Sequence, residues 1–281
     1  MAGAWFELSD VIDRINWHTV QAAVSKDGRL LLTRDINHVA ILWEVSSGKV
    51  LRRFSFDRGV EAVTIADDGR TLVLVCREKN YERSARVLDA LTGKELRRFA
   101  APLLISSANA RWVATFTAGG NDVKLFDAAT GKEVGGSKPA AAKAFACLDL
   151  SNDGKWLILG HKDGAVVLNL READRPAVEL ATGGAEVRSV AFAGDSRSVA
   201  GLCGDNAVRV WETATGKERR CLRSEQVDGP LAVTEDGRRV LVTVPPPKLS
   251  DKPNESVVFD TTTGDVLGRF AGVAAADGSW G

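Results

Sequence analysis

The stretch Asp205–Glu218, DNAVRVWETATGKE, decides the fold of this chain. It consists of a polar turn, an apolar segment that ends at Trp211 and Glu212, and a second turn built on Gly216. Weaker copies of this stretch occur at Asn37–Lys49 (NHVAILWEVSSGK), Ser84–Glu95 (SARVLDALTGKE), Asp122–Glu133 (DVKLFDAATGKE) and Ser256–Asp265 (SVVFDTTTGD). The chain is therefore built from a repeated unit.

A turn of the Asp-Gly type sets the period of the repeat. These turns fall at Asp27-Gly28, Asp68-Gly69, Asn109-Ala110, Asp153-Gly154, Asp195-Ser196, Asp236-Gly237 and Asp277-Gly278. Their second residues are 41, 41, 44, 42, 41 and 41 residues apart, which fits one four-stranded propeller blade per repeat. The apolar segments alternate or run for about four to six residues, so a helical solenoid with 3.6-residue spacing is excluded.

Each repeat contains four expected strands. In the second repeat a modest apolar strand, Ala62–Ala66, leads into the Asp-Gly turn, and a denser one, Leu72–Cys76, follows it. The third strand is the stretch quoted above. The fourth carries arginine pairs at Arg52-Arg53, Arg97-Arg98 and Arg219-Arg220. We expect these charges to blunt the open edge of an outermost strand.

Two motifs carry a resemblance to a known family. WETATGKE at Trp211–Glu218 and LFDAATGKE at Leu125–Glu133 resemble the WD40 repeat, and the resemblance covers nearly the whole chain. It implies an all-β propeller. The Gly-His pair of the family is missing, with His18 alone near that position, so we expect rigidity from apolar packing. Leu231–Phe270 is equally similar to the YVTN-type propeller repeat.

The repeats predict six complete blades over residues 19–270, with a partial seventh over 271–281. Trp280 then falls where Trp112 and Trp156 stand in earlier repeats. Residues 1–18 form a separate segment, either a latch strand at its start or a helix. This is the pattern of a truncated seven-blade template or of a piece of a longer protein. An incomplete blade favours self-association through its open edge.

Composition restricts the class of partner. The 37 basic residues balance the 37 acidic ones, so no global field favours nucleic acid or an anionic membrane. The N-terminus lacks a signal-peptide pattern and no apolar run is long enough for a membrane helix, which predicts a cytoplasmic protein. Four widely separated cysteines predict reduced thiols: Cys76, Cys147, Cys203 and Cys221.

No enzymatic motif is present in the sequence. The repeated Thr-Gly-Lys is a hairpin turn, because it lacks the upstream glycine and the following Ser or Thr of a phosphate-binding loop. His18, His38 and His161 lie in different parts of the chain without zinc-ligand spacing, and we expect solvated loop histidines. The sequence therefore predicts no enzyme, no cofactor and no metal.

Resemblance to WD40 propellers places recognition on the top-face loops, of which two are enlarged: Arg77–Arg83 (REKNYER) and Pro245–Glu255 (PPPKLSDKPNE). Tyr81 is a candidate anchor, although the loop fits a solvated insertion equally well. The candidate partner-binding residues are Arg77, Glu78, Lys79, Asn80, Tyr81, His161, Lys162, Lys248, Asp251 and Lys252.

The leading hypothesis is a non-catalytic module that binds a protein or peptide through these loops. The alternative is a YVTN-like or lactonase-like propeller with a small ligand or metal in a central channel. That alternative needs carboxylates and histidines at the tips of the inner strands, where the sequence supplies mostly Ala, Ser and Val.

Overall fold

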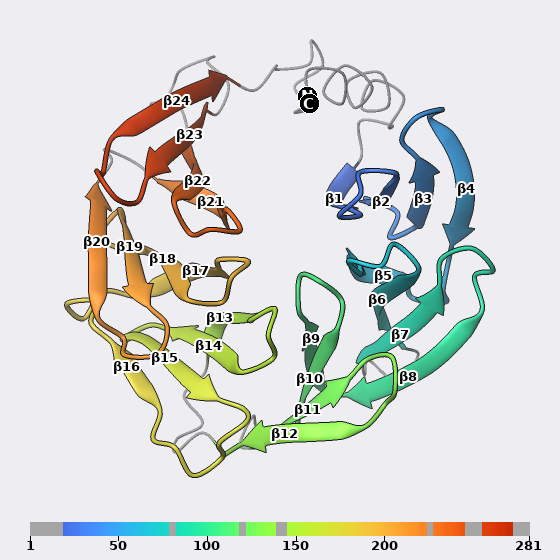
Figure 1. Cartoon of the computed structure of the whole chain (residues 1–281), viewed down its shortest axis with the longest axis horizontal. Coiled ribbons are helices and arrows are strands. Elements are labelled where there is room, and N and C mark those ends of the chain that lie inside the picture. The colour runs from blue at the N-terminus through green and yellow to red at the C-terminus, as the bar shows by residue number, and fades with distance from the viewer. Residues whose placement is uncertain are drawn as a thin grey trace. The chain divides into compact units, whose positions relative to one another are not determined.

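The computed structural model describes residues 19–78, 83–117, 122–138, 145–223, 227–244 and 255–271. All regular elements in these ranges are strands, arranged in six antiparallel four-stranded sheets, as the repeats predict (Figure 1). We call the sheets blades 1 to 6 in chain order. The chain divides into two compact units, Met1–Lys138 and Pro139–Gly281, which are described separately.

The first unit holds blades 1 to 3. Blade 1 contains β1 (Thr19–Val24), β2 (Leu30–Asp35), β3 (Ala40–Glu44) and β4 (Lys49–Phe54). Blade 2 contains β5 (Val60–Ile65), β6 (Thr71–Arg77), β7 (Arg83–Asp89) and β8 (Glu95–Ala101). Blade 3 contains β9 (Leu103–Ser106), β10 (Trp112–Phe116), β11 (Val123–Asp127) and β12 (Glu133–Ser137).

The second unit holds blades 4 to 6. Blade 4 contains β13 (Phe145–Leu150), β14 (Trp156–His161), β15 (Gly164–Asn169) and β16 (Val178–Leu180). Blade 5 contains β17 (Val187–Phe192), β18 (Ser198–Cys203), β19 (Ala207–Glu212) and β20 (Glu218–Arg223). Blade 6 contains β21 (Asp228–Val233), β22 (Arg239–Val244), β23 (Glu255–Asp260) and β24 (Val266–Ala271).

The two expected boundaries, after residue 18 and after residue 270, fall close to the first and last described residues, 19 and 271. Residues 1–18, with their latch strand or helix, and residues 272–281 lie outside the described residues. The sixth blade extends one residue past the expected boundary at 270, because Ala271 still pairs with Glu255.

Apolar side chains between consecutive blades make up the core. Leu42 and Phe54 of blade 1 belong to one buried cluster with Val60, Val63 and Ile65 of blade 2. Complete burial of such a side chain contributes roughly 1.5–3 kcal/mol. Blades 1, 2, 4 and 5 therefore depend on their neighbours, because one face of each is covered by the first strand of the blade that follows it in its unit.

One polar bond of the WD40 type persists inside blade 1. The indole Nε1 of Trp43 donates to Thr33 Oγ1 at 2.9 Å, and both residues are buried. The bond satisfies the only polar atom of the indole ring in an apolar environment. It joins the second strand of the blade to the third.

The Asp-Gly turns are closed by local hydrogen bonds. In blade 1 the Asp27 carboxylate accepts from Ser25 Oγ at 2.6 Å and from the Arg29 amide at 3.0 Å. Gly28 takes a φ of +71°. Ala110 and Ser196 occupy the same turn position with φ of +54° and +62°, so two repeats keep the turn without the glycine.

Arginines of the outer strands link neighbouring blades of the first unit. Arg52 Nε donates to the Leu91 carbonyl of blade 2, and Arg97 Nε donates to the Ala129 carbonyl of blade 3, both at 2.7 Å. The interpretation of these arginines as edge charges alone is therefore incomplete. Each guanidinium satisfies a turn carbonyl on the next blade.

The second unit repeats this link, and strand register identifies the arginine that makes it. Arg220 donates to the carbonyls of Thr261 and Thr262 in blade 6. It pairs with Val210, as Arg97 pairs with Val87 in blade 2. The adjacent-arginine motif hid this equivalence, because the linking residue is first in two of the pairs and second in the third.

Candidate interaction surface

The connections between second and third strands lie at the end of each blade opposite the Asp-Gly turns, since the four strands run antiparallel in sequence order. We call these the loop end and the turn end of a blade. Most of both enlarged loops lies outside the described residues, including Lys79, Asn80, Tyr81, Lys248, Asp251 and Lys252. Arg77, Glu78, His161 and Lys162 are described.

Ion pairs hold the base of the blade-2 loop. Arg77 ends β6 and Arg83 begins β7, and the two residues are partners in the strand register. Both bind Glu61 of β5: Arg77 Nε lies 2.7 Å from Oε1, and Arg83 Nε lies 2.5 Å from Oε2. One carboxylate therefore ties together three strands at the point where the loop leaves the blade.

Glu78 extends this network along β7. Its carboxylate accepts from Ser84 Oγ and from Arg86 Nη2, the latter at 2.9 Å. Arg86 Nη1 also donates to Glu95 Oε2 at 3.1 Å, and its guanidinium lies 4.2 Å from the ring centre of Phe56. Stacking and two carboxylates fix the orientation of Arg86, as suits a planar guanidinium.

These contacts keep the carboxylates of the network ionised. The Ser84 hydroxyl and the Arg86 guanidinium hold the pKa of Glu78 below its usual value. The Arg98 guanidinium does the same for the pKa of Glu95. Burial raises the pKa of Glu61, but hydrogen bonds and charge from Arg83 and Arg77 outweigh it and leave the pKa lowered. Four guanidinium groups thus face three carboxylates.

His161 does not fit the expectation of a solvated loop histidine. It is the last residue of β14 and is 4% exposed. Its Nδ1 accepts from the Asp163 amide at 3.2 Å, and this bond closes a tight turn of Lys162 and Asp163 between β14 and β15. The turn is too short to carry the ring into solvent, so Lys162 and Asp163 are exposed while His161 is not.

Sequence reasoning missed a set of cross-strand ion pairs. Arg209 on β19 pairs with Glu218 on β20, with 3.5 Å between Nε and Oε2. The pairs Arg86–Glu95 and Lys124–Glu133 occupy the same positions in blades 2 and 3, at 3.1 Å each. The sequence contains the signal for these pairs. In each of these blades a basic residue stands two positions before the Trp, Leu or Phe near the end of the third strand, and a glutamate follows in the motif Thr-Gly-Lys-Glu.

Asp149 is a second residue whose position was not foreseen. It lies on β13, where it accepts from the Phe192 amide of blade 5 and from the Leu150 amide, both at 2.8 Å. Burial raises the pKa of the Asp149 carboxyl to about 6, despite these two bonds. The hydrogen bond from the Phe192 amide to Asp149 therefore joins blade 4 to blade 5 through a carboxyl group that is costly to ionise.

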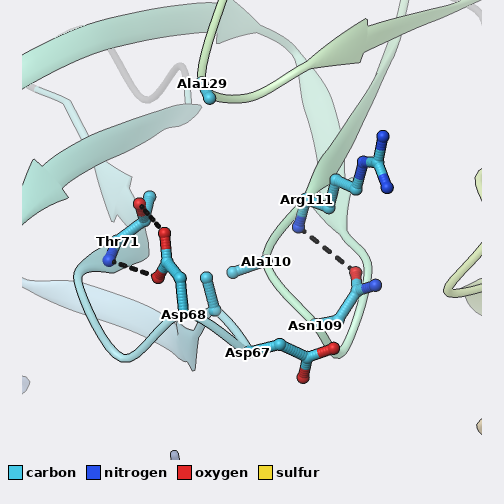
Figure 2. A pocket seen from close by; sticks show the side chains of 8 residues that line it. Asp67, Asp68, Thr71, Asn109, Ala110, Arg111 and Ala129 are labelled. Atoms are coloured by element: carbon cyan, nitrogen blue, oxygen red, sulfur yellow. Dashed lines mark hydrogen bonds between the residues drawn. The ribbon is translucent and has the colours of Figure 1, made fainter.

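A pocket of about 250 Å³ lies at the turn ends of blades 2 and 3. Figure 2 shows Asp68 pointing toward Thr71. The Asp68 carboxylate accepts hydrogen bonds from the Thr71 amide at 3.0 Å and from the Thr71 hydroxyl at 3.1 Å. Asn109 likewise accepts from the Arg111 amide at 3.2 Å. These polar atoms are engaged in the turns themselves. Ala66, Asp67, Ala110 and Ala129 complete the lining.

Among the described residues, no three His, Cys, Asp or Glu side chains are grouped so as to hold a metal ion. The four cysteines are free, as predicted. In the part of the chain that the structure describes, no helix has the length and hydropathy needed to span a membrane.

Comparison with known proteins gives two findings. Residues 178–212 match the family model "WD domain, G-beta repeat"; this span runs from the first residue of β16 to Glu212 at the end of β19. The whole chain is similar to the crystal structure of the Myceliophteria thermophila Cps50 (Swd1) beta-propeller domain. The TM-score is 0.69 at 13% identity, over 91% of this chain and 87% of that one.

No curated protein sequence matches the chain. The structural likeness shows the fold, and the family match identifies one repeat by its sequence. From its six four-stranded blades and its structural likeness, the chain has a β-propeller fold, in which residues 178–212 match the model of the WD domain, G-beta repeat.

Proposed function

We propose that this protein is a non-catalytic scaffold that binds a protein or peptide through the loop ends of its blades. The main contact is assigned to blade 2, around the loop between Arg77 and Arg83. The observation that carries this proposal is the Glu61 carboxylate, which receives both arginines and fixes the two ends of the loop to the sheet.

A rigid base favours binding for an entropic reason. Ordering a loop on association costs free energy, and a loop whose ends are already held loses less freedom. Binding residues are also concentrated on loops that a rigid scaffold positions. The ion pairs around Glu61 and Glu78 supply that rigidity in blade 2.

The same region exposes charged groups that a partner can reach. The side chains of Arg77 and Arg98 are 46% and 45% exposed. Arginine fits protein interfaces because its planar group donates several hydrogen bonds at once. In blade 4 the burial of His161 leaves only the two exposed turn residues, Lys162 and Asp163, so we assign blade 4 a smaller role.

The test is affinity capture with the wild type and a variant in which residues 79–82 are replaced by Gly-Ser. A partner retained by the wild type and lost by this variant supports the assignment, and titration of that purified partner then measures the affinity. The matched control is the double change Leu91→Ser and Lys94→Ser, at the opposite end of the same blade.

Two further results complete the design. Glu61→Gln, which weakens the base without altering the loop, should reduce affinity by a smaller factor than loop removal. Retention of the same partner, at equal affinity, by both the loop variant and the wild type would exclude the blade-2 loop as the contact.

A further inference from the structure

One face of blade 6 is open at positions that are buried in other blades. Leu241 of β22 is paired with Val258 of β23, which is paired with Gly268 of β24. Leu241 is 40% exposed, and Val258 is only partly buried. These residues form a row across the middle of the sheet.

The same row is closed in the four blades that are followed by another blade of their own unit. Their residues at the two registers are 0–2% exposed: Leu32 and Leu42, Val73 and Val87, Ile158 and Val167, and Ala200 and Val210. The first strand of the following blade covers them, as Leu231 of β21 does for Ala200 and Val210. In blade 6 the equivalent residues, Leu241 and Val258, are not covered by a following strand among the described residues.

Phe270 extends the open face. It pairs with Ser256 on β24, and 60% of its surface is exposed. The residues at its register in blades 1, 4 and 5 are 7%, 5% and 3% exposed: Phe54, Leu180 and Leu222. Each of these packs in a cluster with the first strand of the next blade. An aromatic ring in this position therefore lacks its usual neighbour.

The first strand of blade 1 shows the complementary defect. Val24 is 44% exposed, whereas Ile65 and Phe192, at its register in blades 2 and 5, are 4% and 9% exposed. Ala22, two residues earlier, is also exposed. This strand presents the apolar side that, in the later blades, packs on the preceding blade.

We propose that the open face of blade 6 binds β1 of a second copy of this chain. The open face of one copy, with Leu241, Val258 and Phe270, would pack against Ala22 and Val24 of the other copy. Consecutive blades within one unit pack in the same way. A large phenylalanine opposite a small alanine suits such packing. The contact joins two different surfaces, so it is head-to-tail and leaves one free face at each end of a dimer.

Sedimentation velocity and light scattering on the purified full chain test this proposal from about 1 to about 100 µM, where interfaces of moderate affinity are populated. The wild type should form dimers and longer species as concentration rises. Leu241→Glu and Val24→Glu each place a charge in the contact, so each alone should weaken association at least about 30-fold. Both side chains are exposed, so folding should survive.

An equal mixture of these two variants is the decisive sample. The Val24→Glu chain retains the blade 6 face and the Leu241→Glu chain retains β1, so the mixture should form dimers and no longer species. Leu91→Glu, at a residue 66% exposed in the turn between β7 and β8, is the matched control and should associate like the wild type.

Three results would overturn the proposal. A wild type that stays monomeric over the whole range would show that the two faces remain open or are covered within one chain. Association unchanged by both variants would place the contact elsewhere. A mixture that stays monomeric would exclude a head-to-tail contact between these two faces.

Discussion

Arg209 donates to both carboxylate oxygens of Asp205, at 2.9 Å from Nη1 and 2.6 Å from Nη2. The two residues stand four positions apart, on either side of the point where β19 begins, and the Arg209 side chain is 10% exposed. Because of Arg209, the pKa of the Asp205 carboxyl lies below its usual value. The pair stabilises the turn before β19, at the start of the repeated stretch Asp205–Glu218.

Loss of the Asp205 carboxylate should destabilise the fold measurably. In Asp205→Asn the mostly buried guanidinium keeps its charge and its pair with Glu218 but loses the Asp205 carboxylate, which should cost about 1–2 kcal/mol because Asp205 is itself one-third exposed. Urea unfolding measures the change. Glu133→Gln is the control, since Lys124 and Glu133 are 47% and 50% exposed and should contribute under about 0.5 kcal/mol. Equal effects would contradict this role of the pair.

Adjacent arginines of one pair should differ in their contribution to stability. Arg52→Ala removes the hydrogen bond to the Leu91 carbonyl of blade 2 and should cost about 1 kcal/mol. Arg53→Ala, the neighbouring change on the alternate side of β4, should stay within about 0.5 kcal/mol of the wild type. Chemical denaturation of both variants is the measurement. A larger loss for Arg53→Ala would contradict the blade link.

Asp149 should make the protein less stable as pH rises. Its pKa is raised from 3.8 to about 6 in the folded protein, so between about pH 4 and 6 the folded state holds a proton that the unfolded state releases. Ionised Asp149 thus opposes folding above about pH 6, by roughly 2–3 kcal/mol for a shift of this size. Below about pH 4 this penalty is absent.

The comparison with Asp149→Asn isolates that group from the carboxylates whose pKa values are lowered. The unfolding free energy of the wild type, minus that of the variant, should fall by roughly 2–3 kcal/mol between pH 4 and pH 7. The difference removes contributions common to both proteins, such as that of Glu78. A difference that stays constant with pH would show that Asp149 does not titrate in this range.

The turn at Gly28 should require glycine for its backbone alone. Its φ is +71°, and a Cβ added there would meet no atom within 4 Å. Gly28→Ala should therefore cost about 1–2 kcal/mol from left-handed strain without any clash. Gly204→Ala is the control, because an added Cβ would lie 3.5 Å or more from its neighbours and φ is not positive. Thermal unfolding compares the two; equal losses would reject backbone strain as the cause.

Much of the architecture could be predicted from the sequence because it depends on short-range chemistry. The third strands were expected to end at Trp43, Leu88, Phe126, Asn169, Trp211 and Phe259. The strand of blade 4 ends at Asn169, and the other five end one residue later than expected. A carboxylate or hydroxyl at a turn binds amides two or three residues away, as Asp27 does with Arg29. Such bonds need no distant partner, so the sequence pattern contains them.

The candidate site was less predictable. Arg77 and Glu78 were chosen as surface groups, but their ion pairs with Glu61 and Arg86 depend on strands that are brought together by register. His161 was expected in solvent and is buried, because the turn that follows it is two residues long and closes on its ring. Neither these ion pairs nor the burial of His161 can be read from the amino-acid composition.

By itself, the sequence determined a repeat of four strands, the positions of its turns and an apolar face on each blade. Tertiary structure alone decided which arginine reaches the next blade, that Asp149 accepts from the Phe192 amide, and that Leu241 is exposed while Ala200 is covered. The physical reason is range. Turns and alternation arise within a few residues, whereas burial and charge pairing depend on the surface that the neighbouring blade presents.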